Sequence, residues 1–289
     1  MNYIAVVNTF NRDKMLVERC LNALISQKVK PQRIFLIDQN ITGLILPYEI
    51  IFNPLIEVTR VNTKSISEAR NSIKVPVGTN YIFFCDDDGF PDENYSIVLQ
   101  NILNKRPELD LIGGVYLNET DKQYYSKRQK MKGGIKGFID TKKIMGSNLI
   151  IRASTFDELK RFSPDFGVGA YWGASEETDL VWKAYFNKNK IDFFHELIIF
   201  HPPQLSRSLW GEIEKSFKYG FGKSALVAKW LFKKGKLIVS YEFIEMFSIP
   251  ALNFTVGLFT LNFKKALTSF AFFSGRIAGL LRGLFYKFV

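Results

Sequence analysis

The chain of 289 residues contains only two cysteines and two histidines, and this shortage limits the metal sites that it can form. Two cysteines, Cys20 and Cys85, cannot supply a zinc-binding pattern. Cys20 falls in a predicted helix and Cys85 in a predicted buried strand, so we expect both to be packing residues in a reducing compartment. The apolar start, Met1–Val7, lacks a preceding basic region and is not typical of a secretion signal.

Acidic residues are scarce in the last third of the chain. Residues 201–289 contain no aspartate and 4 glutamates against 13 lysines and arginines, whereas residues 1–200 contain 26 basic and 24 acidic residues. Most of the net charge of +11 therefore lies in a tail that is also apolar and aromatic. A basic protein suggests nucleic acid as a partner, but positive charge confined to such a tail fits an anionic membrane better. We expect no nucleic-acid partner.

Glycine is missing from the turn that follows the first predicted strand, Tyr3–Thr9. No Gly-x-Gly-x-x-Gly motif occurs there, which argues against a dinucleotide-dependent oxidoreductase. A nucleotidylyltransferase would normally have a glycine-rich, lysine-bearing loop at this place, and Asn8–Asp13 has no glycine. A metal-dependent nucleotidylyltransferase and a non-catalytic nucleotide- or membrane-binding protein are the alternatives to the function inferred below.

Three consecutive aspartates end a predicted buried strand. In Tyr81–Pro91, five apolar or aromatic residues lead into Asp86, Asp87 and Asp88, and a glycine and a proline follow soon after. Adjacent carboxylates repel one another, so a cation is expected to neutralise them. Asp86 and Asp88 point to one side of an extended backbone, and Mg²⁺ and Mn²⁺ bind one or two such carboxylates. A solvated acidic turn is the alternative.

Short apolar segments alternate with helical ones along residues 1–200. Besides the strand at Tyr81, the pattern predicts strands at Tyr3–Thr9, Arg33–Asp38, Ile56–Val61, Leu109–Leu117, Ser147–Arg152 and Phe193–Phe200. Helices are predicted between them, at about residues 15–27 and at Ser65–Lys74, Pro91–Lys105 and Ala153–Arg161. This order indicates an α/β fold with a mostly parallel, doubly wound sheet, which binds ligands at the carboxyl ends of its strands.

Several polar residues fall at those strand ends: Thr9, Asp38, Asp86 and His201. A lone histidine before Pro202 is usually a structural hydrogen-bonding residue, but its place at a strand end leaves contact with a metal or a diphosphate open. The basic stretch Gln123–Lys143 interrupts the alternation, and we predict a mobile loop or hairpin beside the site.

A second dense stretch, Phe166–Ala184, mixes three glycines with aromatic residues. Ser175, Glu176 and Glu177 then begin a predicted helix whose first turn favours negative charge. Acidic residues at this position are commonly simple caps. Beside a glycine- and tryptophan-rich approach, the glutamate pair is a candidate general base.

The tail after residue 206 predicts helices that associate with a membrane. Trp210–Lys234 is basic, aromatic and amphipathic, Met246–Phe263 has eighteen residues without a charge, and Ala266–Val289 has no acid. Eighteen residues are the lower limit for a membrane span, and Pro250 reduces the apolar character of the segment. We favour helices lying in the membrane interface, with a single span as the alternative.

With these residues in place, the chain resembles the family 2 glycosyltransferases that have the GT-A, Rossmann-like fold. The likeness covers residues 1–205 and depends on four motifs in this order: Val7-Asn8-Thr9-Phe10-Asn11-Arg12, Ser67-Glu68-Ala69-Arg70-Asn71, Asp86-Asp87-Asp88, and Glu176-Glu177-Thr178-Asp179-Leu180. It implies that a sugar is transferred with inversion from a nucleotide diphosphate to an acceptor hydroxyl.

The resemblance also implies roles for the donor-site residues. The base and ribose of the donor are expected near Thr9, Phe10, Arg12 and Asp38, and the diphosphate or sugar near Arg70. Asp86 and Asp88 would hold Mn²⁺ or Mg²⁺, with His201 as a further candidate ligand. Asp87 would lie beside the donor and orient the strand end.

On the acceptor side, the resemblance implies that Glu177 is the base, at a position where the family usually has the aspartate of a Glu-Asp pair. The Glu-Glu pair of this chain leaves Glu176 as the alternative. Tyr171, Trp172 and Asp179 are expected in the sugar or acceptor pocket. Tyr171 and Trp172 have two alternative roles, stacking on a sugar and packing in the core.

These expectations combine into one hypothesis. Residues 1–205 would form the catalytic domain and residues 206–289 a membrane-associated helical region. The basic tail resembles that of enzymes that build bacterial surface polysaccharides or lipid-linked glycans, so the acceptor would be a glycan or a lipid-linked sugar. Residues 127–136 would meet its phosphates. The protein would act at the cytoplasmic face of the cell membrane, bound peripherally.

Overall fold

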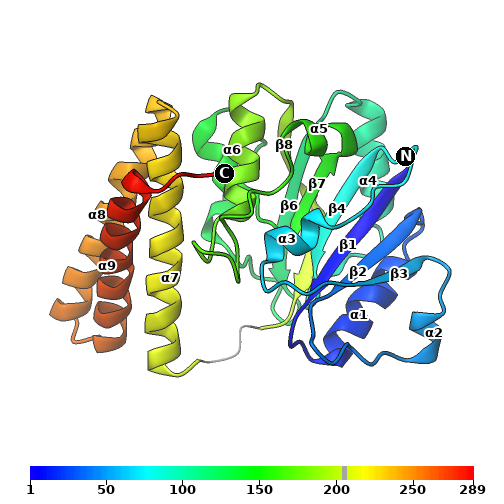
Figure 1. The fold of residues 1–289 in the computed structure, drawn as a ribbon, viewed down its shortest axis with the longest axis horizontal. Coiled ribbons are helices and arrows are strands. Elements are labelled where there is room, and N and C mark those ends of the chain that lie inside the picture. Colours follow the sequence, from blue (N-terminus) through cyan, green and yellow to red (C-terminus); the bar gives the residue numbers. More distant parts are fainter. Residues whose placement is uncertain (204–206) are drawn as a thin grey trace. The chain divides into compact units, whose positions relative to one another are not determined.

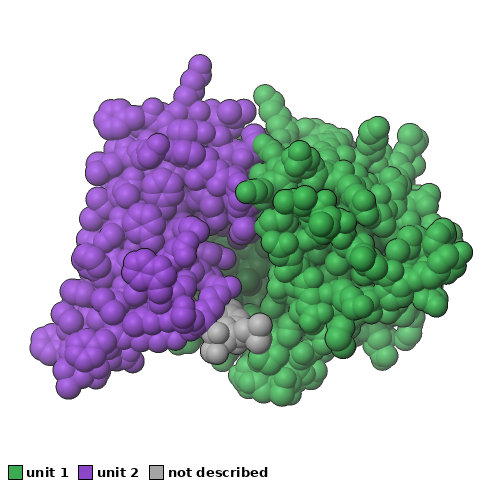
Figure 2. Space-filling model, turned by 60° about the horizontal axis from the view of Figure 1, so that its bottom comes forward, with its two compact units in different colours: residues 1–162, 180–203 green, residues 163–179, 204–289 purple. Residues whose placement is uncertain are grey.

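The computed structural model describes residues 1–203 and 207–289, which form two compact units. Unit 1 contains residues 1–162 and 180–203, and unit 2 contains residues 163–179 and the described residues after 206 (Figure 2). The predicted boundary between residues 205 and 206 lies outside the described part of the chain. Residues 163–179 therefore group with the C-terminal helices, although they precede the predicted boundary.

Unit 1 is built on one eight-stranded sheet with the order β3-β2-β1-β4-β7-β6-β8-β5 (Figure 1). Its strands are β1 (Tyr3–Thr9), β2 (Arg33–Asp38), β3 (Ile56–Arg60), β4 (Tyr81–Asp86), β5 (Phe90–Pro91), β6 (Leu111–Asn118), β7 (Asn148–Arg152) and β8 (Ile191–His201). The first four pair in parallel, as do β6 and β8, whereas β5 and β7 are antiparallel to their neighbours. The predicted mostly parallel α/β sheet is confirmed.

Helices cover both faces of this sheet. One face packs against α1 (Lys14–Ile25), α2 (Tyr48–Ile51) and α4 (Tyr95–Lys105), and the other against α3 (Ile66–Asn71), α5 (Ala153–Glu158) and α6 (Glu176–Phe186) from residue 180 onward. Successive residues of β1 alternate between the two cores, with Ala5 and Val7 in one and Ile4 and Val6 in the other. Burial on both faces explains why the strands are almost continuously apolar.

The basic stretch Gln123–Lys143 is more structured than the predicted mobile loop. Two 3₁₀ helices, Lys127–Lys130 and Phe138–Lys143, occupy much of it. Gln129 is fully buried, and its amide donates to the carbonyl of Gly114 in β6 at 3.2 Å. This hydrogen bond from a buried amide to a backbone carbonyl attaches residues 123–143 to the sheet. The basic charge pattern of the stretch does not predict this contact.

Unit 2 consists of residues 163–179 and a group of helices. These are α7 (Leu209–Val227), a π-helical turn (Ala228–Lys233), a 3₁₀ turn (Leu237–Val239), α8 (Ser240–Phe259) and α9 (Phe263–Phe285). In Figure 1, α7 and α9 run side by side, and glycines of α9 allow the close approach. A Cβ on Gly279 would lie 2.1 Å from the carbonyl oxygen of Phe221, so no larger residue fits there. Such close contacts at small residues are typical of helices that pack in membranes.

An apolar surface is present on these helices. Of the described residues, only Leu237–Phe259 forms a helical stretch that is long and apolar enough to cross a membrane, judged by length and composition. Only 22% of its apolar window is buried. Phe259 and Phe263, which flank the turn into α9, are also largely exposed, and Lys264 and Lys265 follow directly. The surface thus combines apolar groups with positive charge.

Candidate active site

The carboxyl ends of three parallel strands bring the predicted donor-site residues to one edge of the sheet. Asp38 at the end of β2 is in register with Thr9 at the end of β1. Asn8 of β1 is in register with Asp86 at the end of β4. Parallel pairing therefore gathers side chains that are up to 78 positions apart in the sequence. The other two aspartates follow in the turn after β4 and are buried.

Arg12 neutralises two of the three aspartates. Its Nε donates to Oδ1 of Asp87 at 2.9 Å, and its Nη1 lies 2.8 Å from Oδ2 of Asp88. Both carboxylate side chains are nearly buried, at 6% and 10% exposed. Burial raises the pKa of Asp87 to about 6, although the charge of Arg12 acts to lower it. The resemblance implied a contact between Arg12 and the nucleotide, whereas here its guanidinium contacts the acidic cluster.

Asp86 is the most open of the three aspartates. Its side chain is 36% exposed, and Oδ1 accepts from Nη2 of the buried Arg70 at 3.1 Å. Desolvation raises the pKa of Asp86, and the charge of Arg70 opposes this shift. Arg70 comes from α3, whose N-terminus is capped by Ser65. The second predicted motif therefore does place a cation at the end of β4.

His201 lies at the same acidic cluster. The strand β8 ends at His201, whose Nε2 is 3.0 Å from Oδ1 of Asp88 and whose Nδ1 is 2.9 Å from the Tyr125 hydroxyl. Burial acts to lower the pKa of His201, but the hydrogen bond and charge of Asp88 outweigh it and raise that pKa. Burial acts to raise the pKa of Asp88, but His201 and Arg12 outweigh it and lower that pKa. The histidine thus holds one aspartate in its charged form.

Three further residues at this edge differ in how open they are. Phe10 is 43% exposed beyond the end of β1, where an apolar ring can face a ligand. Asp38 is 1% exposed, and its two oxygens accept from the backbone nitrogens of Asn40 and Leu44, so it shapes the loop after β2. Asn8 was not predicted as a site residue, although it belongs to the first motif. Its buried side-chain amide has no hydrogen-bond partner among the described residues, which marks it as a candidate ligand contact.

The donor chemistry of this cluster suits a hard cation. Asp86 and Asp88 offer carboxylate oxygens, and His201, once its ring gives up the proton directed at Asp88, offers a nitrogen that Mn²⁺ accepts. Among the described residues there is no group of three or more His, Cys, Asp or Glu side chains that could hold a metal by themselves. Mg²⁺ and Mn²⁺ bound through one or two carboxylates complete their coordination with water and substrate phosphate oxygens. The cluster therefore fits an ion that arrives with a diphosphate.

The predicted base lies in the first turn of α6, in the part of that helix that belongs to unit 2. Ser175 precedes the helix with a φ of 76°, a left-handed conformation that turns the chain sharply into it. Glu176 is buried, at 8% exposed, whereas Glu177 is partly exposed. Greater access to solvent favours Glu177 as the group that can reach an acceptor.

The three residues expected in the sugar or acceptor pocket all make packing contacts within unit 2. Trp172 is fully buried and packs against the aromatic rings of Phe221 and Tyr286, which is the core-packing alternative. Tyr171 remains 46% exposed and stacks on Tyr286. Asp179 is fully buried and is paired with Lys229 at 3.1 Å.

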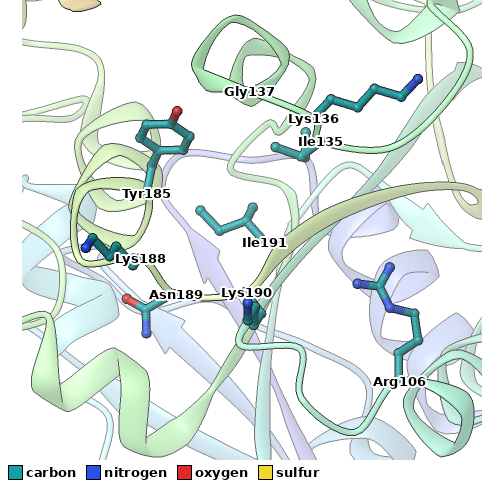
Figure 3. Close-up of a pocket in the computed structure, with 9 residues that line it drawn as sticks. All are labelled: Arg106, Ile135, Lys136, Gly137, Tyr185, Lys188, Asn189, Lys190 and Ile191. Atoms are coloured by element: carbon teal, nitrogen blue, oxygen red, sulfur yellow. The ribbon is translucent and has the colours of Figure 1, made fainter.

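A separate hollow of about 280 Å³ lies at the opposite edge of the sheet (Figure 3). Its lining includes Arg106 before β6 and Lys190 and Ile191 at the start of β8. His201 ends this same strand, about 30 Å away at the usual rise per residue. The hollow is therefore distinct from the acidic cluster.

A mostly parallel α/β sheet binds its ligands at the carboxyl ends of its strands, which is where the acidic cluster lies. The family model described as "Glycosyl transferase family 2" matches residues 4–173. This match covers more than half of the 289 residues, so the chain belongs to glycosyl transferase family 2. A search of curated proteins found no sequence match.

Solved structures similar to this chain include those of S. aureus TarS. One TarS structure matches with a TM-score of 0.60 and 13% identity, over 84% of this chain and 43% of that one. TarS 1–349 in complex with UDP matches with a TM-score of 0.55 and 12% identity, over 96% and 91% of the two chains. The complex of TarS 1–349 with UDP-GlcNAc matches with a TM-score of 0.54 and 13% identity, over 99% and 93%. At this identity the likeness concerns the fold, and it confirms the GT-A architecture.

Proposed function

We propose that this family 2 member is an inverting, metal-dependent glycosyltransferase that moves a sugar from a nucleotide diphosphate to an acceptor hydroxyl. The observation that supports this most is the acidic cluster at the carboxyl edge, where Asp86 and Asp88 lie among Arg12, Arg70 and His201. The solved structures of TarS with UDP and UDP-GlcNAc support a nucleotide-sugar donor. We propose a glycan or lipid-linked acceptor in surface glycan synthesis.

In this mechanism the acidic cluster would hold the diphosphate of the donor through a bound cation. Asp86, the most exposed aspartate, and Asp88 would bind Mn²⁺ or Mg²⁺, with His201 as an additional ligand. The ion would neutralise the negative charge that the leaving diphosphate gains. Arg70 is fixed at Asp86 and contributes positive charge beside the same group. The acceptor hydroxyl would displace the nucleotide diphosphate in a single step, which inverts the configuration at the anomeric carbon of the sugar. The carboxylate of Glu177 would remove the proton of this hydroxyl.

A donor screen tests this proposal directly. The full chain is incubated with UDP-, GDP-, dTDP- and CMP-sugars, with and without Mn²⁺, and hydrolysis and thermal unfolding are measured. We expect one nucleotide class to be hydrolysed slowly and to raise the unfolding temperature only with the ion. No turnover and no ion-dependent binding would favour a non-catalytic binding protein. Release of pyrophosphate from a nucleoside triphosphate and a sugar phosphate would favour the nucleotidylyltransferase.

Replacing Arg12 with alanine tests the electrostatics of the cluster. The change removes the cation beside the buried Asp87 and Asp88, so we expect the free energy of unfolding to fall by about 1–3 kcal/mol. Mn²⁺ should then stabilise Arg12→Ala more than the wild type, because the ion replaces the missing charge. Arg33→Ala is the matched control, since Arg33 is similarly exposed and its partner, Glu57, is on the surface. Equal responses of both variants to Mn²⁺ in thermal unfolding would contradict a metal site here.

We propose that unit 2 binds an anionic membrane peripherally, at the cytoplasmic face, through its exposed apolar and basic surface. Flotation with vesicles of phosphatidylcholine and phosphatidylglycerol measures this binding. Each lysine near such a surface contributes about 1 kcal/mol, so the double variant Lys264→Glu/Lys265→Glu should bind at least about 30-fold more weakly. Lys28→Glu/Lys30→Glu, at two exposed positions of unit 1, is the charge-matched control and should bind normally. Equal loss in both, or wild-type binding that is insensitive to salt, would refute this surface.

A further inference from the structure

We propose that Lys229 and the C-terminal residues Tyr286–Val289 are positioning groups for the segment 163–179, whose end includes Glu176 and Glu177. The C-terminal helices would then be needed for catalysis itself, in addition to any role at a membrane. This inference depends on the proposed function for the role of the glutamates. The anchoring of the segment can be tested without it.

The first anchor is a buried ion pair. Asp179 is fully buried and Lys229 is 4% exposed, and Nζ of Lys229 lies 3.1 and 3.2 Å from the two carboxylate oxygens. The indole nitrogen of Trp230 donates to Oδ1 of Asp179 at 2.8 Å. Asp179 lies two residues after Glu177 in the same helical turn, and its backbone nitrogen donates to the carbonyl of Ser175. The contacts that fix this carboxylate therefore also fix the start of the helix.

The position of Lys229 depends on an irregular turn. Residues 228–233 form a π-helical turn directly after α7, in which the backbone nitrogen of Lys234 donates to the carbonyl of Lys229. An inserted residue of this kind changes the direction of the side chains around it and often occurs at functional places. The ammonium group also lies 5.1 Å from the ring centre of Phe166, within the segment itself. The turn thus places one lysine against two parts of the segment.

The second anchor is the end of the chain. The hydroxyl of Tyr286 donates to Oδ1 of the buried Asp165 at 2.8 Å, and the backbone nitrogen of Val289 donates to Oδ2 at 2.8 Å. The ring of Phe288 stacks on Phe166 with an angle of 6° between the planes. Tyr286 stacks on Tyr171 in the same way, at 12°. Both ends of the segment are therefore held by residues that are 50 or more positions later in the sequence.

The chemistry of the ion pair predicts its role. A buried carboxylate that loses its cation must take up a proton or move toward water, and either change would shift the first turn of α6. Lys229 and Asp179 are both buried and do not face a substrate. A change at either residue should therefore affect turnover by moving Glu176 and Glu177. The donor-site residues of unit 1 make none of these contacts. A defect in the anchor should thus lower turnover and leave donor binding intact.

Lys229→Met, of similar length but neutral, tests the anchor. We expect kcat to fall at least tenfold while the Kd for UDP with Mn²⁺ changes less than twofold, and amide hydrogen exchange in residues 163–180 to become faster. Lys229→Arg should retain most of kcat, because the charge stays. The double variant Asp179→Asn/Lys229→Met should recover part of it, because no buried charge is left alone. Tyr286→Phe should speed exchange around residue 165.

Lys223→Met is the matched control. It breaks another ion pair of the same helices, between Lys223 and the buried Glu242 at 2.8 Å. We expect normal kcat and normal exchange in the segment. Wild-type kcat in Lys229→Met, or the same loss in Lys223→Met, would overturn the positioning role. If the wild type transfers no sugar, the proposed function fails, and unchanged exchange in Lys229→Met would then separately overturn the anchoring.

Discussion

Replacing Asp88 with asparagine is expected to lower sugar transfer by about 10³-fold and to abolish ion-dependent binding of the nucleotide. The two side chains have nearly the same shape, so the main loss is negative charge. One Asp88 oxygen lies 3.0 Å from Nε2 of His201 and the other 2.8 Å from Nη1 of Arg12. Without the carboxylate, His201 and Arg12 lose their shared partner and the ion loses a ligand. Initial rates and isothermal titration with UDP, each with and without Mn²⁺, measure both effects.

Glu93→Gln provides the control for this change. Glu93 lies on the surface of unit 1 just before α4 and outside the acidic cluster, so its neutralisation should alter neither rate nor affinity. Thermal unfolding separates a lost ligand from a lost fold, because Asp88→Asn should still unfold cooperatively. An Asp88→Asn protein that binds UDP with the wild-type response to Mn²⁺ would exclude Asp88 as a metal ligand.

The sheet and its carboxyl edge could be predicted because both follow from local patterns. Buried parallel strands are apolar runs that end in polar residues, and their shared direction brings Thr9, Asp38 and Asp86 to one edge. The cap at Ser65 was equally local, since its hydroxyl accepts from the backbone nitrogen of Glu68 three residues later. Strand ends and helix starts therefore needed no knowledge of distant contacts.

The contacts of Asp179 and Trp172 with distant residues could not be predicted from local patterns. Asp179 stands in the first turn of a helix beside two glutamates, a pattern that is the same for a solvent-facing cap and for a buried ion pair. Its burial depends on Lys229, fifty residues later, and no local rule connects the two. Trp172 shows the same limit, because an aromatic residue next to glycines fits a sugar surface and a core equally well. Contacts between distant residues decided each case.

Replacing Glu177 with glutamine is the second large effect that we expect. The amide keeps the shape of the side chain but cannot accept the proton of the acceptor, so turnover should fall by about 10²–10⁴-fold. The donor site of unit 1 is untouched, and the Kd for UDP with Mn²⁺ should stay unchanged. Single-turnover transfer to an acceptor and titration with UDP distinguish this loss of chemistry from a loss of binding.

Glu176→Gln is the matched variant, since it makes the same change at the neighbouring position of the same helical turn. Glu176 is 8% exposed, whereas Glu177 is partly exposed, so we expect Glu176→Gln to retain most of the turnover. The reverse result would assign the base to Glu176. Equal loss in both variants, together with faster hydrogen exchange in residues 163–180, would mean that the two changes disturb the first turn of α6 rather than remove a base. Only a selective loss in Glu177→Gln with unchanged UDP affinity fits a base held in place by the anchored segment.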